Sequence, residues 1–229
     1  MLKIENLCKT FNKGQIDEKK VFDNLNMSID NGEFIIILGG NGTGKSTLMN
    51  LISGSLIPES GKIYLDDKDI TNLPEHKRAK FIGRVFQDPL KGTSPNLTIE
   101  ENLSLAILRT KKRTLSFGIN KNNRNLFREK LSELNLGLED RLNAKIGLLS
   151  GGQRQAVTLL MATIVQPKIL LLDEHTAALD PKSQNKILEL TNKIVSDKSM
   201  ITIMITHNME HMNRFSARVI DLLGYKLFG

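Results

Sequence analysis

Two short runs of consecutive apolar residues stand out from the polar pattern around them. Residues 34–38 read FIIIL, and residues 169–172 read ILLL. Continuous apolar runs of this length are typical of parallel strands that are buried on both faces. The sequence therefore predicts a central parallel sheet, with one strand near the beginning of the chain and another in its last third.

The first third of the chain also carries alternating patterns that favour antiparallel strands. Residues 2–29 predict two strands around a polar insert at residues 12–20, and residues 61–65 begin a further hairpin. The turn of that hairpin is Asp66-Asp67. A positive φ there costs most residues on the order of 1 kcal/mol and costs Asn or Asp less, so the turn is tolerable.

Helical spacing dominates the middle of the chain, most clearly at residues 99–106 and 125–135. We expect residues 91–166 to form a helical lobe that is inserted into a core made of residues 1–90 and 167–229. The fold class predicted for all 229 residues is a single α/β domain. It has a parallel sheet, an antiparallel β layer near the amino end and an inserted helical lobe.

Composition agrees with one compact intracellular protein, since 40% hydrophobic residues can build a core that 25% charged residues cover. The only cysteine, Cys8, excludes an internal disulfide and fits a reducing compartment, and we expect it to pack as a small core residue. The first residues lack the pattern of a signal peptide, and no stretch approaches the roughly 20 apolar residues that span a bilayer. Any association with a membrane is therefore expected to come through a partner.

The net charge of +7 is concentrated in the middle third of the chain. A solvated basic face near an anionic membrane is the interpretation that we favour. Nucleic-acid binding is the alternative, but the cluster lacks the repeated aromatic residues that stack on bases, and we expect no nucleic-acid partner. The cluster consists of Arg109, Lys111, Lys112, Arg113, Lys121, Arg124 and Arg128.

The segment GGNGTGKST, which we call the glycine loop, follows the first apolar run and precedes a helical pattern that extends to Gly54. It satisfies G-x-x-x-x-G-K-[ST], the pattern of a phosphate-binding loop. Its residues are Gly39, Gly40, Asn41, Gly42, Thr43, Gly44, Lys45, Ser46 and Thr47. Backbone N–H groups of such a loop surround the β-phosphate, while Lys45 would reach the β- and γ-phosphates, Ser46 would bind Mg²⁺ and Thr47 would face the α-phosphate.

Two carboxylates, Asp173 and Glu174, come directly after the second apolar run. Because side chains alternate along a strand, the two acids start on different faces. One can then bind Mg²⁺ through water while the other addresses a nucleophilic water. We expect Asp173 on the metal side and Glu174 as the general base.

A run of small and polar residues, Leu149-Ser150-Gly151-Gly152-Gln153, precedes another helical pattern, and we call it the serine–glycine run. Ser150 offers a hydroxyl, and the two glycines let backbone N–H groups approach an anion. The positive N-terminus of the helix that follows Gln153 is aimed at the same point. The run therefore predicts a second phosphate contact, although such residues also cap helices without any ligand.

In the order of its motifs, nearly the whole chain resembles the nucleotide-binding subunits of ATP-binding cassette (ABC) transporters. Gln87 in VFQDP lies between the glycine loop and the serine–glycine run, and Asp180 in ALD and His207 in ITH follow the two acids. The resemblance implies that Gln87 contacts Mg²⁺ and the attacking water, that Asp180 lines a dimer seam and that His207 contacts the γ-phosphate. It also places Phe11 where an aromatic ring stacks on adenine, with packing in the core as the alternative for this ring.

The resemblance further implies a head-to-tail dimer, most simply a homodimer. Ser150 and the residues after it would close over the γ-phosphate that the glycine loop of the other subunit holds, so ATP joins the subunits and its hydrolysis separates them. We expect in-line attack of water on that phosphate. Glu174 would polarise the water, His207 and Gln87 would position it, and Lys45 with Mg²⁺ would neutralise the developing charge.

Partners follow from the same resemblance. Permease subunits in the membrane are expected to dock near Gln87, with residues 90–96 in the groove, and to hold the chain on the cytoplasmic face. An extracytoplasmic substrate-binding protein is expected as well. The stretches at residues 83–89 and 173–181 are similar to those of bacterial import systems assigned to tryptophan, tyrosine or related small molecules. In the second stretch His175 stands where most relatives have proline, and we expect it to be a structural residue of the turn.

Other classes of protein remain as alternatives. A nucleoside or metabolite kinase shares the glycine loop but does not need the serine–glycine run. A nucleotide-gated binding module without turnover does not need Glu174 and His207. A cassette ATPase that acts on nucleic acid or ribosomes is the strongest alternative. Such proteins usually carry a coiled-coil insertion or a second cassette, and neither pattern is found here. Relatives also continue further beyond the histidine, so a truncated or divergent carboxyl end is expected.

Overall fold

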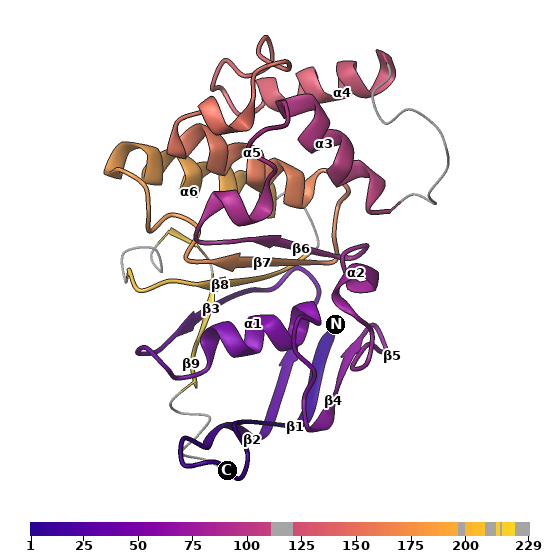
Figure 1. The fold of residues 1–229 in the computed structure, drawn as a ribbon, viewed down its shortest axis with the longest axis vertical. Coiled ribbons are helices and arrows are strands. Elements are labelled where there is room, and N and C mark those ends of the chain that lie inside the picture. The colour runs from indigo at the N-terminus through magenta and orange to yellow at the C-terminus, as the bar shows by residue number, and fades with distance from the viewer. Residues whose placement is uncertain (111–120, 197–199, 209–213, 216, 223–229) are drawn as a thin grey trace.

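The computed structural model describes residues 1–110, 121–196, 200–208, 214–215 and 217–222. Five parallel strands form the central sheet in the order β6-β7-β8-β3-β9 (Figure 1). Their bounds are β3 (Phe34–Leu38), β6 (Ile82–Val85), β7 (Ile169–Asp173), β8 (Ile201–Ile205) and β9 (Arg218–Asp221). Both predicted buried strands are confirmed, and they lie in the interior of the sheet.

The side chains of these strands alternate between two hydrophobic cores. Ile36 and Leu170 face the helices that cover one side of the sheet, whereas Ile35, Ile37 and Leu171 face α1 (Lys45–Ser53) and the antiparallel layer on the other side. Figure 1 shows these layers stacked one above another. Burial on both faces explains why the strands read as unbroken apolar runs.

The antiparallel sheet has the strand order β2-β1-β4-β5. Its strands are β1 (Leu2–Phe11), β2 (Lys19–Ile29), β4 (Ser60–Leu65) and β5 (Lys68–Asp69). The predicted layer is confirmed, and the Asp66-Asp67 turn has φ values of 47° and 63°. The expectation for Cys8 is wrong: its side chain is only half-buried, because β1 is irregular there and Sγ accepts a hydrogen bond from the N–H of Asn24 at 3.3 Å.

Helices occupy the chain between β6 and β7. The elements there are η1 (Pro89–Gly92), α3 (Ile99–Leu108), α4 (Lys121–Ser132), η2 (Ile146–Leu148) and α5 (Gly151–Thr163), and α6 (Pro181–Ser196) packs against α5. The helix predicted at 125–135 begins and ends earlier than its pattern suggests. Its first turn is stabilised by Arg124, which donates to both carboxylate oxygens of Glu100 at 2.8 and 2.7 Å. Its end precedes Asn135, where φ is 51°.

The basic cluster is not one solvated face in the part of the chain that the structure describes. Arg109 is half-buried, and its Nη2 donates to the carbonyl of Met161 at 2.5 Å. Burial lowers the pKa of its guanidinium. Arg124 is paired with Glu100, and residues 111–113 lie outside the described residues. The interpretation as a solvated face is therefore wrong for Arg109, since its guanidinium stabilises the end of α5 instead.

None of the described helices is long and apolar enough to cross a bilayer.

The carboxyl end of α1 is held by a buried cation. Arg78, at the end of α2 (Glu75–Arg78), is completely buried and donates to the carbonyls of Leu51, Ile52, Thr71 and Leu73 at 2.7 to 2.8 Å. Burial lowers its pKa to about 10, so it remains charged at neutral pH. A cation at this end complements the helix dipole, whose positive end supports the glycine loop.

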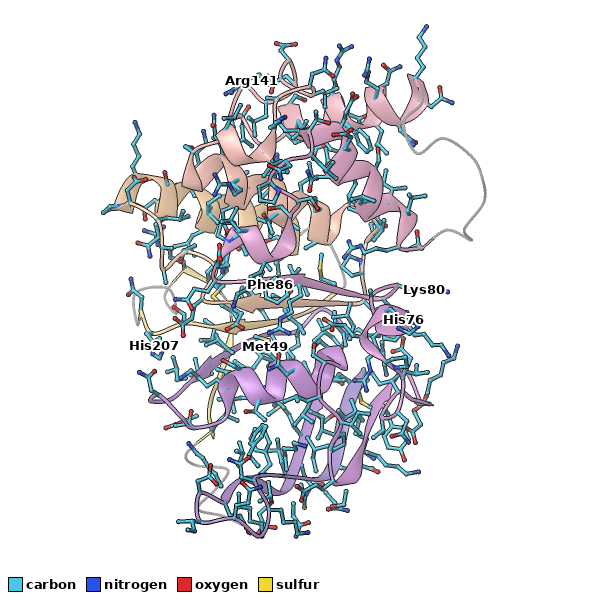
Figure 2. The ribbon with its side chains drawn as sticks, viewed as in Figure 1. Met49, His76, Lys80, Phe86, Arg141 and His207 are labelled. Carbon is cyan, nitrogen blue, oxygen red and sulfur yellow. The ribbon has the colours of Figure 1, made fainter. Side chains whose placement is uncertain are left out.

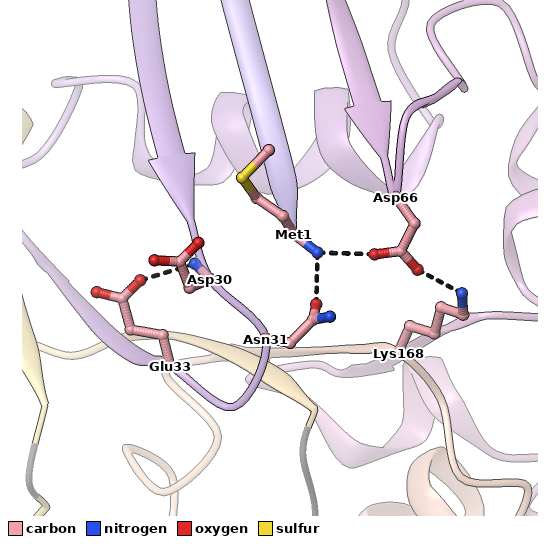
Figure 3. A network of polar contacts seen from close by, with 6 residues as sticks. All are labelled: Met1, Asp30, Asn31, Glu33, Asp66 and Lys168. Atoms are coloured by element: carbon pink, nitrogen blue, oxygen red, sulfur yellow. Dashed lines mark hydrogen bonds and ion pairs between the residues drawn. The ribbon is translucent and has the colours of Figure 1, made fainter.

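A polar network joins the antiparallel layer to the amino ends of the parallel strands. Figure 3 shows Asp66 between the amino group of Met1, at 2.7 Å, and Nζ of Lys168, the residue before β7. The hydrogen bond from Lys168, together with that from Met1, lowers the pKa of the Asp66 carboxyl from 3.8 to about 2. The network thus favours the ionised form of Asp66 in the folded protein.

We expect this network to make folding stability depend on pH in a defined window. Because the folded pKa of Asp66 is depressed, its contribution is fully present above about pH 4 and is lost as the pH falls towards 2. Asp66→Asn should be less stable at neutral pH and should lose less stability across that window. The measurement is urea unfolding of native protein, Asp66→Asn and the exposed neighbour variant Asp67→Asn, and an identical acid slope in all three would contradict the assignment.

Candidate functional site

The glycine loop joins β3 to α1 at the carboxyl end of the parallel sheet. Three of its glycines have a left-handed backbone, with φ of 141° at Gly39, 78° at Gly42 and 105° at Gly44. A Cβ at Gly44 would also lie 2.6 Å from Cγ1 of Val21 and 3.0 Å from Cζ of Phe22. The glycines therefore let the loop pass directly against the antiparallel layer.

Lys45 begins α1, and its side chain turns back over the loop. The side chain is buried, and Nζ donates to the carbonyls of Gly39 at 2.6 Å and Gly40 at 2.9 Å. Thr43 Oγ1 also donates to the Gly40 carbonyl, at 3.0 Å. An ammonium group has three donors, so Lys45 has one more for a phosphate oxygen. The first N–H groups of α1 supply further donors at the same end of the helix.

A cleft of about 760 Å³ adjoins this loop. Four of the predicted site residues, Ser46, Gln87, Asp173 and Glu174, line it although they are far apart in the sequence. Among the described residues that line the cleft, none belongs to the serine–glycine run. The other lining residues include Asn50, Arg84, Phe86, Asp88 and Lys91.

Asp173 ends β7 and pairs with a residue of the neighbouring strand. Arg84 Nη2 lies 3.3 Å from Asp173 Oδ2, and Arg84 Nη1 donates to Asn50 Oδ1 at 2.8 Å. The guanidinium also lies over the ring of Phe86, 4.6 Å from its centroid. This arrangement fixes the orientation of the Asp173 carboxylate while engaging only one of its oxygens. Arg84 is not predicted from the sequence, because only the pairing of β6 with β7 brings it to Asp173.

Glu174 and His207 form a contact at the ends of two adjacent strands. Glu174 Oε1 lies 2.8 Å from His207 Nε2, and the side chains are 21% and 47% exposed, so water can reach the pair. Figure 2 shows His207 at one end of the parallel sheet. The φ of Glu174 is 46°, a strained value for a residue with a side chain. Strain of this kind concentrates at functional sites.

The serine–glycine run begins α5 rather than preceding it. Ser150 is the N-cap, its Oγ accepts from the N–H of Gln153 at 3.2 Å, and Gln153 Oε1 accepts from the N–H of Ser150 at 3.3 Å. The hydroxyl proton of Ser150 and the N–H groups of Gly151 and Gly152 have no role in this capping box. Helix capping and anion binding are therefore compatible here. Leu149 is buried in the core of the helical lobe.

Three further predicted residues lie on other elements. Asp180 caps α6, because its Oδ1 accepts from the N–H of Ser183 at 3.1 Å, and these hydrogen bonds lower its pKa. Phe11 is half-buried against the antiparallel core, and Nζ of Lys9 lies 5.4 Å from its ring centroid. His175 is buried, with Nε2 3.1 Å from Thr191 Oγ1, which agrees with a structural role in the turn.

The donor set in the cleft fits a hard divalent cation. Ser46 offers a hydroxyl, Gln87 an amide oxygen and Asp173 a carboxylate, and Mg²⁺ prefers such oxygen ligands together with waters and phosphates. Among the described residues no three His, Cys, Asp or Glu side chains gather at a metal position. A site of this composition therefore suits a metal that arrives with a nucleotide.

Comparisons with known proteins agree with this geometry. A family model described as ABC transporter matches residues 22–177. The tyrosine transport ATP-binding protein of Clostridioides difficile (strain R20291) is 48% identical over 222 residues, which cover 97% of this chain and 88% of that relative.

Two solved structures have the same fold. A dimeric structure of the ATP-binding cassette MJ0796, in a post-hydrolysis state with ADP and Pi, aligns with a TM-score of 0.81 and 32% identity over 96% of this chain and 94% of that one. The cbiO1 protein of Clostridium perfringens, part of the ABC transporter complex cbiONQ, aligns with a TM-score of 0.76 and 29% identity over 96% and 83%. The similarity thus extends over almost the whole chain.

Proposed function

Because this chain belongs to the ABC transporter family, as a subunit that binds and hydrolyses ATP to drive transport, we propose that its cargo is tyrosine or a related small aromatic solute. The observation that carries this choice is the 48% identity to a tyrosine transport protein over 97% of the chain. Permease subunits would hold it at the cytoplasmic face of a membrane. An extracytoplasmic binding protein would deliver the cargo.

ATP hydrolysis in this proposal uses residues of the cleft together with residues of the glycine loop and the antiparallel layer. The glycine loop and Lys45 bind the phosphates, and the ring of Phe11 stacks on adenine. Glu174 takes the proton from the attacking water. His207, whose Nε2 lies 2.8 Å from Glu174 Oε1, and Gln87, which lines the cleft, position that water. Lys45 neutralises charge that develops on the γ-phosphate.

Mg²⁺ would be held by Ser46, Gln87 and Asp173, whose oxygens line the cleft. When bound, the ion would neutralise negative charge on the phosphates. Arg84 keeps the Asp173 carboxylate oriented towards this position through the contact at 3.3 Å.

The serine–glycine run would complete the site of a second subunit in a head-to-tail homodimer. Support comes from its position, because the run does not line its own cleft and yet offers unused donors at the start of α5. Asp180, which caps the adjacent α6, would lie at the same seam. We propose that residues 91–166 form the helical lobe that carries this surface and that residues 1–90 and 167–229 form the core.

A cavity of about 300 Å³ in the helical lobe is the permease site that we propose. It lies between η1, α3 and α5, and Lys91, Gly92, Thr93 and Ser94 line it together with Leu105 and Arg109. Its charged lining residues, among those described, are Arg84, Lys91 and Arg109, all of them cations. A cytoplasmic helix of the permease with an acidic side chain would complement this cavity.

The experiment is purification of the chain with its membrane partners, followed by ATPase measurement in proteoliposomes. We expect tyrosine together with its binding protein to stimulate hydrolysis, whereas an aliphatic amino acid of similar size should not. Stimulation by an unrelated solute alone would overturn the choice of cargo without affecting the assignment as a transport ATPase.

A further inference from the structure

We propose that Lys19 is a second lysine of the nucleotide site and binds the β-phosphate from the antiparallel layer. This inference rests on the proposed binding of ATP by the glycine loop. It adds a residue that comes from β2, outside the loop and outside every motif recognised in the sequence.

The first observation is the position of the ammonium group. A Cβ built on Gly42 would lie 3.1 Å from Nζ of Lys19, so the side chain extends over the loop at a point where there is no side chain in the way. Gly42 has a φ of 78°, and its N–H group belongs to the part of the loop that surrounds the β-phosphate. Lys19 therefore brings a positive charge to the same anion.

The second observation is the pairing of Lys19 with Phe11. The two residues are directly opposite each other in the antiparallel ladder of β1 and β2. Residues in that relation have their side chains on the same face of the sheet. The ammonium of Lys19 thus lies between the ring that would stack on adenine and the loop that would bind the phosphates, where the phosphate chain has to pass.

In the part of the chain that the structure describes, the neighbouring acids form no ion pair with Lys19. Asp17 accepts a hydrogen bond from Asn12 Nδ2 at 2.6 Å, and Glu18 accepts one from the N–H of Gly14 at 2.7 Å. Both carboxylates are used inside the connection between β1 and β2. Among the ion pairs of the described residues, none involves Lys19, whereas its neighbour Lys20 is paired with Asp23 at 2.5 Å.

Lys19→Met tests the inference, and Lys20→Met is the matched control. Isothermal titration with ATP and with ADP should show about tenfold weaker binding of both nucleotides for Lys19→Met, because both carry a β-phosphate. Lys20→Met should bind both nucleotides as the native protein does. At about 1 M salt, where the Debye length is about 3 Å, the difference between native protein and Lys19→Met should shrink.

Two further variants separate the possible failures. Lys19→Arg keeps the charge and should keep affinity within about twofold of native, and thermal unfolding checks that all variants are folded. Lys45→Ala should lose nucleotide binding, and if it does not, the proposed phosphate site itself fails. Equal affinities for Lys19→Met and Lys20→Met, with Lys45→Ala inactive, would overturn the role of Lys19 alone.

Discussion

Glu174→Gln is expected to bind ATP with native affinity and to lose at least about 100-fold in turnover. The amide has the shape of the carboxylate and can still contact His207, which lies 2.8 Å from Glu174 Oε1. It cannot accept a proton from water. ATP should therefore persist in the site, and the protein should accumulate as a dimer that light scattering after size-exclusion chromatography detects.

Glu189→Gln provides the matched control. Glu189 is exposed on α6, so this substitution makes the same chemical change away from the cleft. It should hydrolyse ATP at the native rate and should not accumulate as a dimer. Normal turnover in Glu174→Gln would show that another group activates the water.

Ser150→Arg is expected to bind ATP as a monomer and to lose ATP-dependent dimerisation together with turnover. The long cation would occupy the exposed surface at the start of α5, where Ser150 and the N–H groups after it would meet the γ-phosphate of a second subunit. Because Ser150 does not line its own cleft, nucleotide affinity of the monomer should change little. Dimerisation is best measured in the Glu174→Gln background, where ATP persists.

The loss of the helix cap has to be separated from the loss of the contact between subunits. Thr98 is the N-cap of α3 with the same kind of capping box, formed with Glu101. Ser150→Ala and Thr98→Ala should each cost about 1 kcal/mol of stability. Only the Ser150 variant should then lower turnover, and an equal loss in both would mean that Ser150 acts through the stability of its helix.

Candidate site residues can be predicted from the sequence alone where their chemistry depends on local chain geometry. The glycine loop needs glycines with a left-handed backbone and a helix directly after them, and a short stretch of consecutive residues is enough to predict both. Asp173 and Glu174 come directly after the buried apolar run at residues 169–172, which clearly predicts a strand. Gln87 and His207 required the family resemblance, because only the adjacency of β6, β7 and β8 brings Gln87 into the cleft of the acids and His207 into contact with Glu174.

Other features depend on tertiary contacts that no local pattern reports. The side chain of Arg84 reaches Asp173 on the neighbouring strand, and Arg124 extends α4 by pairing with Glu100. Arg109 looked like a solvated charge, but its guanidinium caps carbonyls at the end of α5. In each case an arginine with ordinary sequence surroundings obtains its role from the partner that the fold brings to it.

The order of strands in the central sheet has a consequence for synthesis of the protein. β3, which leads into the glycine loop, is paired on one side with β8 and on the other with β9, the last two strands among the described residues. At about 5 to 20 residues per second, a ribosome needs roughly 10 to 35 s after making β3 before β9 is complete. Until β8 is complete, which takes most of that time, the apolar segment Phe34–Leu38 has neither of its neighbouring strands, so chaperone binding to the nascent chain should be strongest there.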